Sequence, residues 1–395
     1  MKGNENKPHI GIFGRRNNGK SSLINAITGQ EIAIVDSLAG TTTDPVKKSI
    51  EIFGIGPAVL IDTAGIDDEG DIGQKRVQKT MEILKIIDFA IVVISQGEYA
   101  IPEESLVSKL HEYEIPYLLV NNKSDLQIPD IKEIDGHKIW NVSTQTRAGI
   151  AEMLGELVKQ MPSTAYVSHS LLDGLVGESD TVLLVTPIDT EAPEGRLILP
   201  QVQLIRDILD HNAIAVVLKE DKVRDYLASN PAPKLAVTDS QMFGRVSKDI
   251  PEPIPLTGFS IILAHHKGDF QHYLAGTPHL DRLKDGDRIL MLESCTHQTS
   301  CEDIGRHKLP HWILQYTGKQ LEFDFVSGLN SLPDITKYAM VIQCGGCMLT
   351  QRQLKVRLKP AVDRGIPVSN YGMTIAYMNG IFDRATKPFS EISAD

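Results

Sequence analysis

Residues 9–21 read His9-Ile-Gly-Ile-Phe-Gly14-Arg-Arg-Asn-Asn-Gly19-Lys20-Ser21, and this stretch decides the fold of the first part of the chain. Its opening residues are apolar or small and predict a short buried strand, and helical spacing begins after Ser21. The glycines between strand and helix let backbone N–H groups face a phosphate at the helix N-terminus. The pattern therefore predicts a P-loop, in which Lys20 reaches the β- and γ-phosphates and the Ser21 hydroxyl binds Mg²⁺.

Further nucleotide-binding motifs follow in the order typical of a GTPase. The apolar strand Val59–Asp62 ends in a carboxylate that would hold Mg²⁺ through water, and the N–H of Gly65 would sense the γ-phosphate. Asp125, which ends Asn122-Lys-Ser-Asp, can accept hydrogen bonds from guanine N–H groups that adenine cannot offer, so we expect GTP rather than ATP. Thr42 is the expected second Mg²⁺ hydroxyl. The expected catalytic residues are Lys20, Thr42, Asp62 and Gly65, and the expected nucleotide contacts are Gly14, Asn17, Asn18, Gly19, Lys20, Ser21, Ser22, Asn122, Lys123, Asp125, Ser143 and Thr144.

The composition and charge of the chain limit the classes of ligand that it is expected to bind. The 395 residues are 42% hydrophobic and 23% charged, with a formal net charge of −11. This acidic balance argues against nucleic acid as the main ligand, because phosphate neutralisation needs clustered Lys and Arg. The sequence shows no apolar run long enough for a transmembrane helix, and the polar start Met1–Pro8 is not that of a signal peptide. We therefore expect a cytoplasmic protein.

The length and the alternating strand and helix patterns predict an α/β protein of three domains. We expect a GTPase domain at 1–165, a small α/β domain at 171–258 and a second small α/β domain at 259–395. The middle domain has few strands and no recognisable catalytic pair. Pairing of its open sheet edges across a two-fold axis is therefore expected to make a homodimer.

The last domain is expected to be an open, mostly parallel sheet that carries a metal cluster. Such sheets bind ligands beyond the carboxyl ends of their strands. The predicted strands are 260–263, 289–292, 321–325 and 339–342, and the predicted helices are 351–363 and 373–382.

All four cysteines lie in this domain, as Cys295-Thr-His297, Cys301 and Cys344-Gly-Gly-Cys347. Cys295 and Cys344 each follow a predicted strand, so both groups should emerge at one edge of the sheet. Thiolates gathered in this way predict a metal site, because four cysteines in so long a chain make a poor disulfide framework. A closed set of four ligands, either all four cysteines or three of them with His297, would suit zinc, whereas three thiolates and an exchangeable fourth ligand would suit a [4Fe–4S] cluster. A dithiol redox pair at Cys344 and Cys347 is a third alternative.

The first domain resembles the TrmE, Era and EngA branch of GTPases. The resemblance is carried by Asn17 in the P-loop, by the switch Gly40-Thr-Thr-x-Asp44 and by Asp62-Thr-Ala-Gly-Ile66. Ile66 stands where Ras-like proteins carry a water-positioning Gln. The resemblance implies a K⁺ ion held partly by Asn17, and hence a slow GTPase that K⁺ accelerates more than Na⁺.

The whole chain resembles the [FeFe]-hydrogenase maturation GTPases (HydF), because these GTPase motifs are joined to Cys295-Thr-His297 and Cys344-Gly-Gly-Cys347. The resemblance implies a [4Fe–4S] cluster on Cys295, Cys344 and Cys347, with an exchangeable fourth ligand. It also implies a scaffold role. Such a scaffold accepts a diiron precursor with CO, cyanide and dithiolate ligands from radical-SAM maturases and passes it to apo [FeFe]-hydrogenase.

One residue departs from that family pattern. Many members carry His immediately before the Cys-x-x-Cys, where this chain has Gln343, and an amide is a poor iron ligand beside an imidazole. The fourth ligand is therefore expected from His297, Cys301, Glu302, Asp303 or water, and the resemblance favours a non-cysteine ligand. The alternative function is a zinc-stapled assembly or RNA-maturation GTPase, in which the cysteines serve only as a staple.

Overall fold

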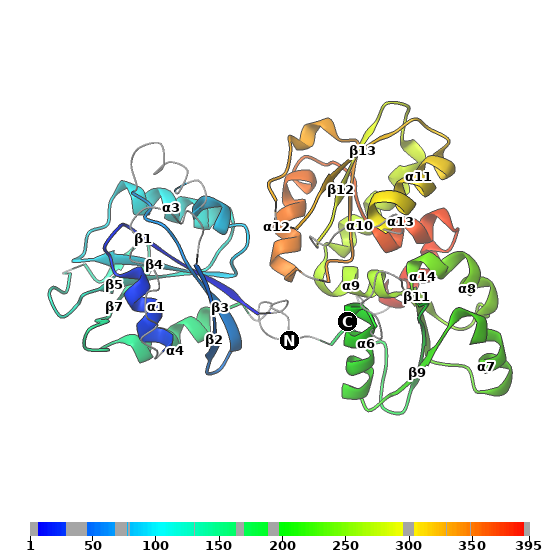
Figure 1. The fold of residues 1–395 in the computed structure, drawn as a ribbon, viewed down its shortest axis with the longest axis horizontal. Helices are drawn as coiled ribbons and strands as arrows, with labels where there is room; N and C mark the ends of the chain where they lie inside the picture. Colours follow the sequence, from blue (N-terminus) through cyan, green and yellow to red (C-terminus); the bar gives the residue numbers. More distant parts are fainter. Residues whose placement is uncertain are drawn as a thin grey trace. The chain divides into compact units, whose positions relative to one another are not determined.

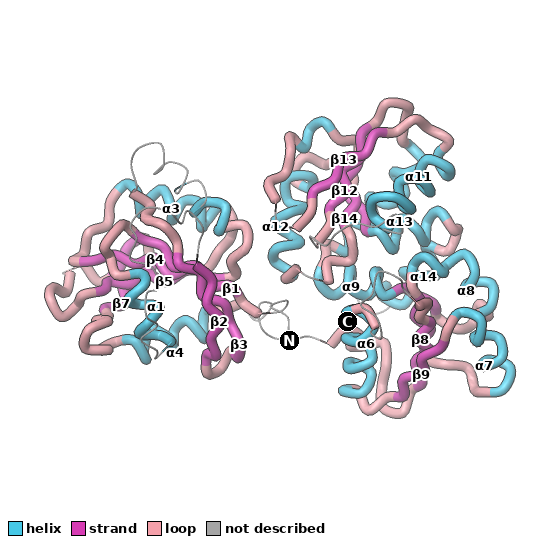
Figure 2. Tube along the Cα trace, in the orientation of Figure 1, coloured by secondary structure: helices cyan, strands magenta, loops and turns pink. Residues whose placement is uncertain are grey.

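The structure, a computed structural model, describes residues 7–28, 46–67, 77, 80–129, 131–162, 170–188, 197–294, 304–328, 330–347 and 349–390. The chain divides into two compact units, Met1–Val167 and Ser168–Asp395 (Figure 1). Each unit is built from strands in sheets with helices packed around them (Figure 2). This confirms the predicted α/β fold class. None of the described helices is long and apolar enough to cross a membrane.

The first unit is a seven-stranded sheet in the order β2-β3-β1-β4-β5-β7-β6. Its inner strands run parallel, and the edge strands β2 and β6 are antiparallel to their neighbours. Strand β4 is buried along its whole length, because separate apolar cores with helices over them cover the two faces of the sheet. The strands are β1 His9–Gly14, β2 Val46–Ile52, β3 Gly56–Asp62, β4 Phe89–Ser95, β5 Tyr117–Asn122, β6 Glu133–Ile134 and β7 His137–Asn141, and the helices are α1 Lys20–Thr28, α3 Ile101–Glu112 and α4 Ile150–Gln160.

The second unit holds two four-stranded sheets, each parallel throughout. The first has the order β11-β10-β8-β9 and the second has the order β13-β12-β14-β15. The strands are β8 Thr181–Val185, β9 Ile214–Leu218, β10 Leu235–Thr238, β11 Leu256–Gly258, β12 Arg288–Leu292, β13 Glu322–Val326, β14 Met340–Gln343 and β15 Val368–Asn370. The α-helices are α6 Leu199–Asp210, α7 Val223–Ser229, α8 Phe243–Asp249, α9 Phe259–Lys267, α10 Phe270–Gly276, α11 Leu309–Thr317, α12 Gln351–Val362, α13 Tyr371–Met378 and α14 Phe382–Ser390.

One apolar core runs through both sheets of the second unit, and a second, smaller core lies on the first sheet. Helix α9 lies between the sheets (Figure 1) and contacts α6 beside the first and α12 beside the second. The C-terminal helix α14 returns to the first sheet, where the Thr257 hydroxyl donates a hydrogen bond to the Ala385 carbonyl at 2.7 Å. The two sheets are therefore held together by α9, from the middle of the unit, and by α14, from its C-terminal end.

Two sequence-based predictions in this unit are wrong. The predicted strand 260–263 lies in helix α9, where residues 261–264 are all buried. A helix that is buried on all sides has no polar face, so its short apolar run cannot be told from a strand by periodicity. The predicted helix 373–382 is interrupted, because α13 ends at Met378 and α14 begins at Phe382. The strands expected at 289–292, 321–325 and 339–342 are confirmed as β12, β13 and β14.

Candidate functional site

The P-loop connects β1 to α1 and is curled around a lysine. Lys20 is buried, and its Nζ donates hydrogen bonds to the carbonyls of Gly14 and Arg15 at 3.0 and 2.9 Å. Gly19 has a φ of 85°, and a Cβ there would lie 2.3 Å from the side-chain amide of Asn122, so glycine is required. The loop therefore presents its backbone at the start of a helix, as phosphate binding requires.

The predicted Mg²⁺ residues on this loop and on β3 meet. Ser21 Oγ donates a hydrogen bond to Asp62 Oδ2 at 2.6 Å, and the buried Oδ1 of Asp62 has no hydrogen-bond partner among the described residues. Burial raises the pKa of the Asp62 carboxyl, and the Ser21 hydroxyl, Lys20 and Lys48 oppose that rise. A divalent cation would stabilise the carboxylate in the same way, so these residues fit Mg²⁺. Thr42, the second expected hydroxyl ligand, lies outside the described residues.

The residues predicted to recognise guanine are also brought together. Asn122 Nδ2 donates to the carbonyl of Asn18 at 3.1 Å, and Asn122 Oδ1 accepts from the N–H of Thr144 at 3.3 Å. Ser143 Oγ donates to Asp125 Oδ1 at 2.5 Å, which fixes the carboxylate expected to read the base. One network thus joins the P-loop to both base-contacting loops.

Three other predicted positions lie in the P-loop or beside it. Asn17 and Lys123 adopt left-handed backbone conformations, with φ of 65° and 60°. The N–H of Ile66 donates to the carbonyl of Gly14 at 3.3 Å, which places Gly65 and its neighbour beside the phosphate loop. Ile66 is buried, so the position carries no group that could orient a water molecule.

Sequence reasoning missed the carboxylate that holds Arg15. Glu103, on α3, is fully buried and accepts hydrogen bonds from Nε and Nη2 of Arg15, each at 2.8 Å. It also accepts a bond from the N–H of Ala100 at 3.1 Å and so caps α3. No local motif reveals this pair, because the two partners are 88 positions apart.

Cys344 lies at the carboxyl edge of the second sheet of the second unit. Its N–H donates to the carbonyl of Leu292, the last residue of β12, at 2.9 Å. Its Sγ lies 3.1 Å from the backbone nitrogen of Ser294 and 2.8 Å from the Ser294 hydroxyl oxygen. Ser294, the residue that precedes Cys295, therefore lies beside Cys344 at this edge, and the meeting of the two cysteine groups stays a prediction.

Gln343 contributes a further polar group beside this sulfur. Its side chain is completely buried, and Nε2 donates to the Leu292 carbonyl at 3.2 Å and to the Ser294 hydroxyl at 3.3 Å. The same nitrogen lies 3.6 Å from Cys344 Sγ. Oε1 is buried without a hydrogen-bond partner among the described residues. The residue that departs from the family pattern is therefore an N–H donor toward the sulfur.

A buried guanidinium lies near the same thiol and was not predicted. Arg357, on α12, is 6% exposed and donates to the carbonyls of Glu293 and Val326 at 2.8 and 2.9 Å. Burial lowers the pKa of the Arg357 guanidinium, and negative charge on Cys344 is the first of the influences that oppose this fall.

The remaining candidate ligands lie outside the described residues; they are Cys295, His297, Cys301, Glu302 and Asp303. Within the described part of the chain, no three His, Cys, Asp or Glu side chains are grouped so that they could bind one ion. Cys344 and Cys347 are both half-buried. Soft thiolate donors with N–H groups and a cation beside them fit an iron–sulfur or zinc site.

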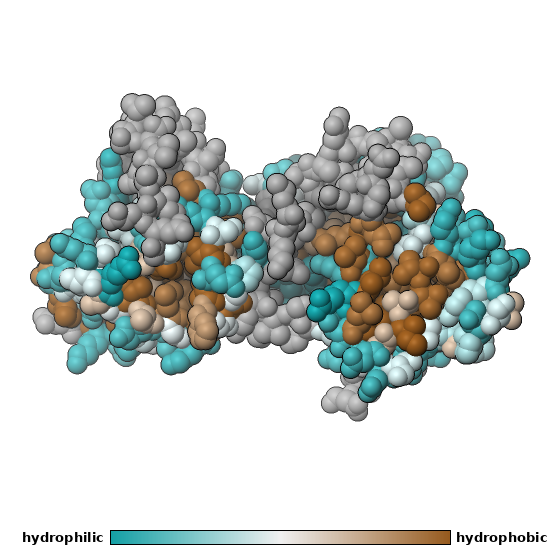
Figure 3. Space-filling view, turned by 60° about the horizontal axis from the view of Figure 1, so that its bottom comes forward, coloured by the Kyte–Doolittle hydropathy of each residue, from teal (hydrophilic) through white to brown (hydrophobic). Residues whose placement is uncertain are grey.

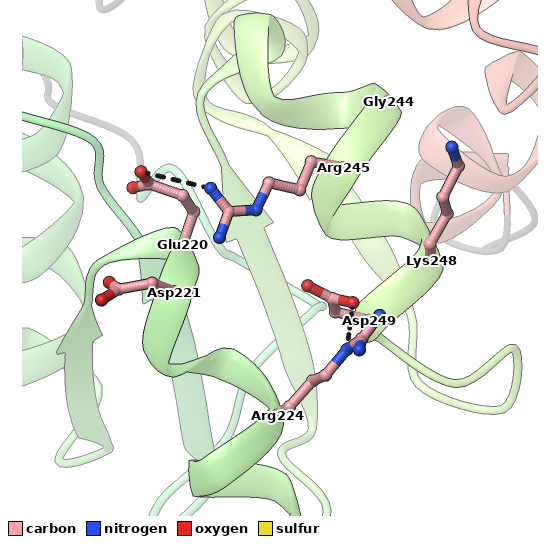
Figure 4. Close-up of a pocket in the computed structure, with 7 residues that line it drawn as sticks. All are labelled: Glu220, Asp221, Arg224, Gly244, Arg245, Lys248 and Asp249. Atoms are coloured by element: carbon pink, nitrogen blue, oxygen red, sulfur yellow. Dashed lines mark hydrogen bonds and ion pairs between the residues drawn. The ribbon is translucent and has the colours of Figure 1, made fainter.

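A separate polar recess of ≈520 Å³ lies between α7 and α8 (Figure 4). Its charges are matched internally, because Arg224 pairs with Asp249 and Arg245 lies 3.7 Å from Glu220. It contains no thiol and lies on elements of the first sheet of the unit, so it is not part of the sulfur site.

Comparison with known proteins reveals three consecutive family matches. Residues 9–123 match the family described as 50S ribosome-binding GTPase. Residues 171–268 match the Hydrogen maturase F dimerization domain, and residues 271–388 match the Hydrogen maturase F tetramerization domain.

Curated relatives match only part of the chain. The tRNA modification GTPase MnmE of Chromobacterium violaceum is 33% identical over 156 residues, which are 39% of this chain and 34% of that protein. MnmE of Hydrogenovibrio crunogenus is 33% identical over 214 residues, 53% of this chain and 44% of that protein. The chain thus spans less than half the length of these relatives. Among solved structures, the G domain of the T. maritima FeoB iron transporter matches with 18% identity and a TM-score of 0.32, covering 40% of this chain and 99% of that one.

The order of the matches is what identifies the chain. The GTPase match covers the P-loop and the strands around it, and the two Hydrogen maturase F matches cover the two sheets of the second unit, including Cys344 and Cys347. The chain therefore belongs to the hydrogen maturase F (HydF) family of hydrogenase maturation GTPases.

Proposed function

We propose that this protein is a GTP-hydrolysing scaffold that carries a [4Fe–4S] cluster on Cys295, Cys344 and Cys347. In this role it receives a diiron precursor from radical-SAM maturases in the cytoplasm and delivers it to apo [FeFe]-hydrogenase. The observation that supports it most is the position of Cys344, whose sulfur contacts Ser294, the residue before Cys295, in a chain that also carries a GTPase domain.

The GTPase part of the proposal follows from the residues of the first unit. Lys20 would neutralise the β- and γ-phosphates, Ser21 and Asp62 would hold Mg²⁺, and Asp125 would select guanine. Two features predict slow hydrolysis. Ile66 cannot orient the attacking water, and Arg15 is held by Glu103 rather than supplied to the transferred phosphoryl group. GTPases that are unaided, or aided only by a group in cis, turn over at about 10⁻⁴–10⁻² s⁻¹.

Potassium is the proposed source of the missing positive charge. Asn17, at the turn of the P-loop, would supply part of its coordination. We expect the rate of GTP hydrolysis in K⁺ to exceed the rate in Na⁺ at equal ionic strength by about tenfold or more, since compensating transition-state charge is worth 10³-fold or more in related systems. Asn17→Ala should remove most of the difference and leave GTP binding intact. Equal rates in the two salts would contradict potassium activation and leave the GTPase assignment standing.

The cluster part of the proposal rests on the sulfur site. Cys295, Cys344 and Cys347 would hold the cluster, whose exchangeable fourth iron position would supply a place for precursor binding. The chain's own groups would stabilise the bound sulfur, because Ser294 and Gln343 direct N–H and O–H groups at Cys344. His297, Cys301, Glu302, Asp303 and water remain the candidates for the fourth ligand.

Metal content after anaerobic reconstitution tests this assignment. About four irons and four sulfides per chain are expected, with an EPR signal on reduction. Cys344→Ala and Cys347→Ala should each abolish stable cluster binding, because three thiolates are the minimum set proposed. Stoichiometric zinc in the purified protein, with no cluster taken up, would sink the scaffold role.

A second function is favoured by the curated relatives, which are tRNA modification GTPases. In that function the cysteines would bind zinc and only stabilise the second unit, and the GTPase would act in assembly or RNA maturation. The net charge of −11 opposes it. Zinc content together with tRNA binding that weakens steeply with salt would favour this alternative over the scaffold.

The matched families also point to assembly, since their descriptions name dimerization and tetramerization. We propose a homodimer formed through the first sheet of the second unit. Its outer strand β9 exposes Ile214 and Val217, and the adjoining helix α6 exposes Val202 and Leu209. Figure 3 shows apolar side chains gathered on the surface of this unit. Pairing of two copies would cover an open edge that otherwise invites aggregation.

A further inference from the structure

Arg357 is a buried cation whose hydrogen bonds go to neutral backbone groups. Its Nη atoms donate to the carbonyls of Glu293 and Val326, and its buried Nε has no hydrogen-bond partner in the described part of the chain. No carboxylate of the described residues lies within ion-pair distance of it. Burying a charge in this way costs several kcal/mol unless a nearby negative charge compensates it.

The neighbouring carboxylate, that of Glu293, cannot fully compensate the charge of Arg357. The side chain of Glu293 is already held by Arg306, through contacts of 2.9 to 3.1 Å, and by the Ser327 hydroxyl at 2.6 Å. Arg384 provides a contrast within the same unit. It also donates to backbone carbonyls from a helix, but it lies 3.6 Å from the carboxylate of Glu252.

Hydrogen-bond donors surround the sulfur of Cys344, which lies beside the segment that Arg357 contacts. Ser294 directs its backbone N–H at Cys344 Sγ, and its hydroxyl accepts from Gln343 Nε2 and so can donate its own proton to the sulfur. Hydrogen bonds to an ionised acceptor are about twice as strong as those between neutral groups. These donors are therefore placed to stabilise a sulfur that binds a cluster, and Arg357 holds the backbone of the residue before Ser294.

We propose that Arg357 is the counter-charge of the thiolate-bound cluster and raises its reduction potential. The inference rests on the proposed function and makes Arg357 a positioning residue, not a ligand. Three thiolates outweigh the 2+ core of an oxidised cluster, and reduction adds one more negative charge. A fixed cation stabilises the reduced form more than the oxidised form, since net charge and hydrogen bonding to sulfur set the potentials of such clusters.

The test compares full-length variants after anaerobic reconstitution. Wild type, Arg357→Met and Arg357→Lys are analysed for iron and sulfide and then titrated potentiometrically with EPR detection. Arg384→Met is the matched control, because it removes an arginine that also donates to carbonyls but has its own carboxylate partner. We expect the reduction potential of Arg357→Met to be more negative than that of wild type by about 59 mV or more. At the potential where half of the wild-type cluster is reduced, the ratio of reduced to oxidised cluster in Arg357→Met should then be at least tenfold lower. Arg357→Lys and Arg384→Met should stay near wild type.

The possible failures are distinguishable. Full iron content in Arg357→Met with an unchanged potential overturns the inference and leaves the scaffold role standing. An equal shift in Arg357→Lys also overturns it, because that variant keeps the charge. If Arg357→Met does not fold, Arg357→Gln carries the same expectation, since the amide can still donate to a backbone carbonyl but has no charge. Wild type that binds no cluster overturns the proposed function and the inference together.

Discussion

Glu103 ties the phosphate-binding loop to a helix that begins far along the chain. Its two oxygens accept from Arg15 and from the N–H of Ala100, and its side chain is fully buried. The hydrogen bonds that Arg15 donates to Glu103 are the main reason that the pKa of the Arg15 guanidinium lies above its usual value. One carboxylate thus links the P-loop to the start of α3 and occupies the guanidinium of Arg15.

Breaking this pair should destabilise the first unit. We expect Glu103→Gln to lower the free energy of unfolding by about 2 kcal/mol, because it leaves a partly buried guanidinium with only the exposed Glu98 as a counter-charge. Arg15→Met should cost more, since it leaves the fully buried carboxylate of Glu103 without its counter-charge. Denaturant unfolding followed by Trp140, in a Trp312→Phe background, would report this unit alone. A coupling free energy near zero in the double variant would contradict the interpretation.

At the scale of elements, α9 shows where periodicity stops being informative. Residues 261–264 are apolar and buried, and such a run fits a central strand as well as a helix with neighbours on every side. Gly258 ends β11 and is the residue before α9, so strand and helix follow one another without a turn sequence. The neighbours that decide between the two structures are α6, α12 and α13, and their positions cannot be read from the local sequence.

His265 gives α9 a pH-dependent contribution to stability. Its ring packs against Phe270 of α10 and Phe389 of α14, with centroids 4.9 and 4.7 Å away, and burial lowers the pKa of the imidazole below 6.5. The unfolded chain therefore binds the proton more readily than the folded one, so stability is complete above about pH 6.5 and falls as the pH drops toward the folded-state pKa.

The variant His265→Gln isolates this contribution. Its free energy of unfolding should change less between pH 7 and pH 5 than that of wild type, because glutamine does not titrate in this range. Carboxylates elsewhere titrate equally in both proteins and cancel in the comparison. Trp312 fluorescence in a Trp140→Phe background would follow the second unit. Parallel pH profiles for the two proteins would show that the imidazole is not held in its neutral form.

At the scale of the whole molecule, the sequence predicts the sites better than it predicts the groups that support them. The P-loop residues are found together because their motif is local, and Cys344 lies beside Ser294 because parallel strands place their carboxyl ends at one edge. Arg357 and Glu103 escape prediction for the opposite reason. Each is an ordinary helical residue whose role comes only from contacts with segments 31 to 88 positions away.

The exposed edge of the first sheet of the second unit predicts that copies of the whole molecule assemble. Ile214 and Val217 on β9 are 52% and 42% exposed, and the matched family is described as a dimerization domain. We expect light scattering of the wild type to give at least twice the chain mass of 43.5 kDa. Ile214→Lys with Val217→Lys should halve that mass, because desolvating two ammonium groups at an apolar interface costs several kcal/mol. Phe53→Lys, which changes a fully exposed apolar residue of the first unit, is the matched control and should leave the mass unchanged. A wild type that stays monomeric at micromolar concentration, or a β9 variant that keeps the wild-type mass, would move the interface away from this edge.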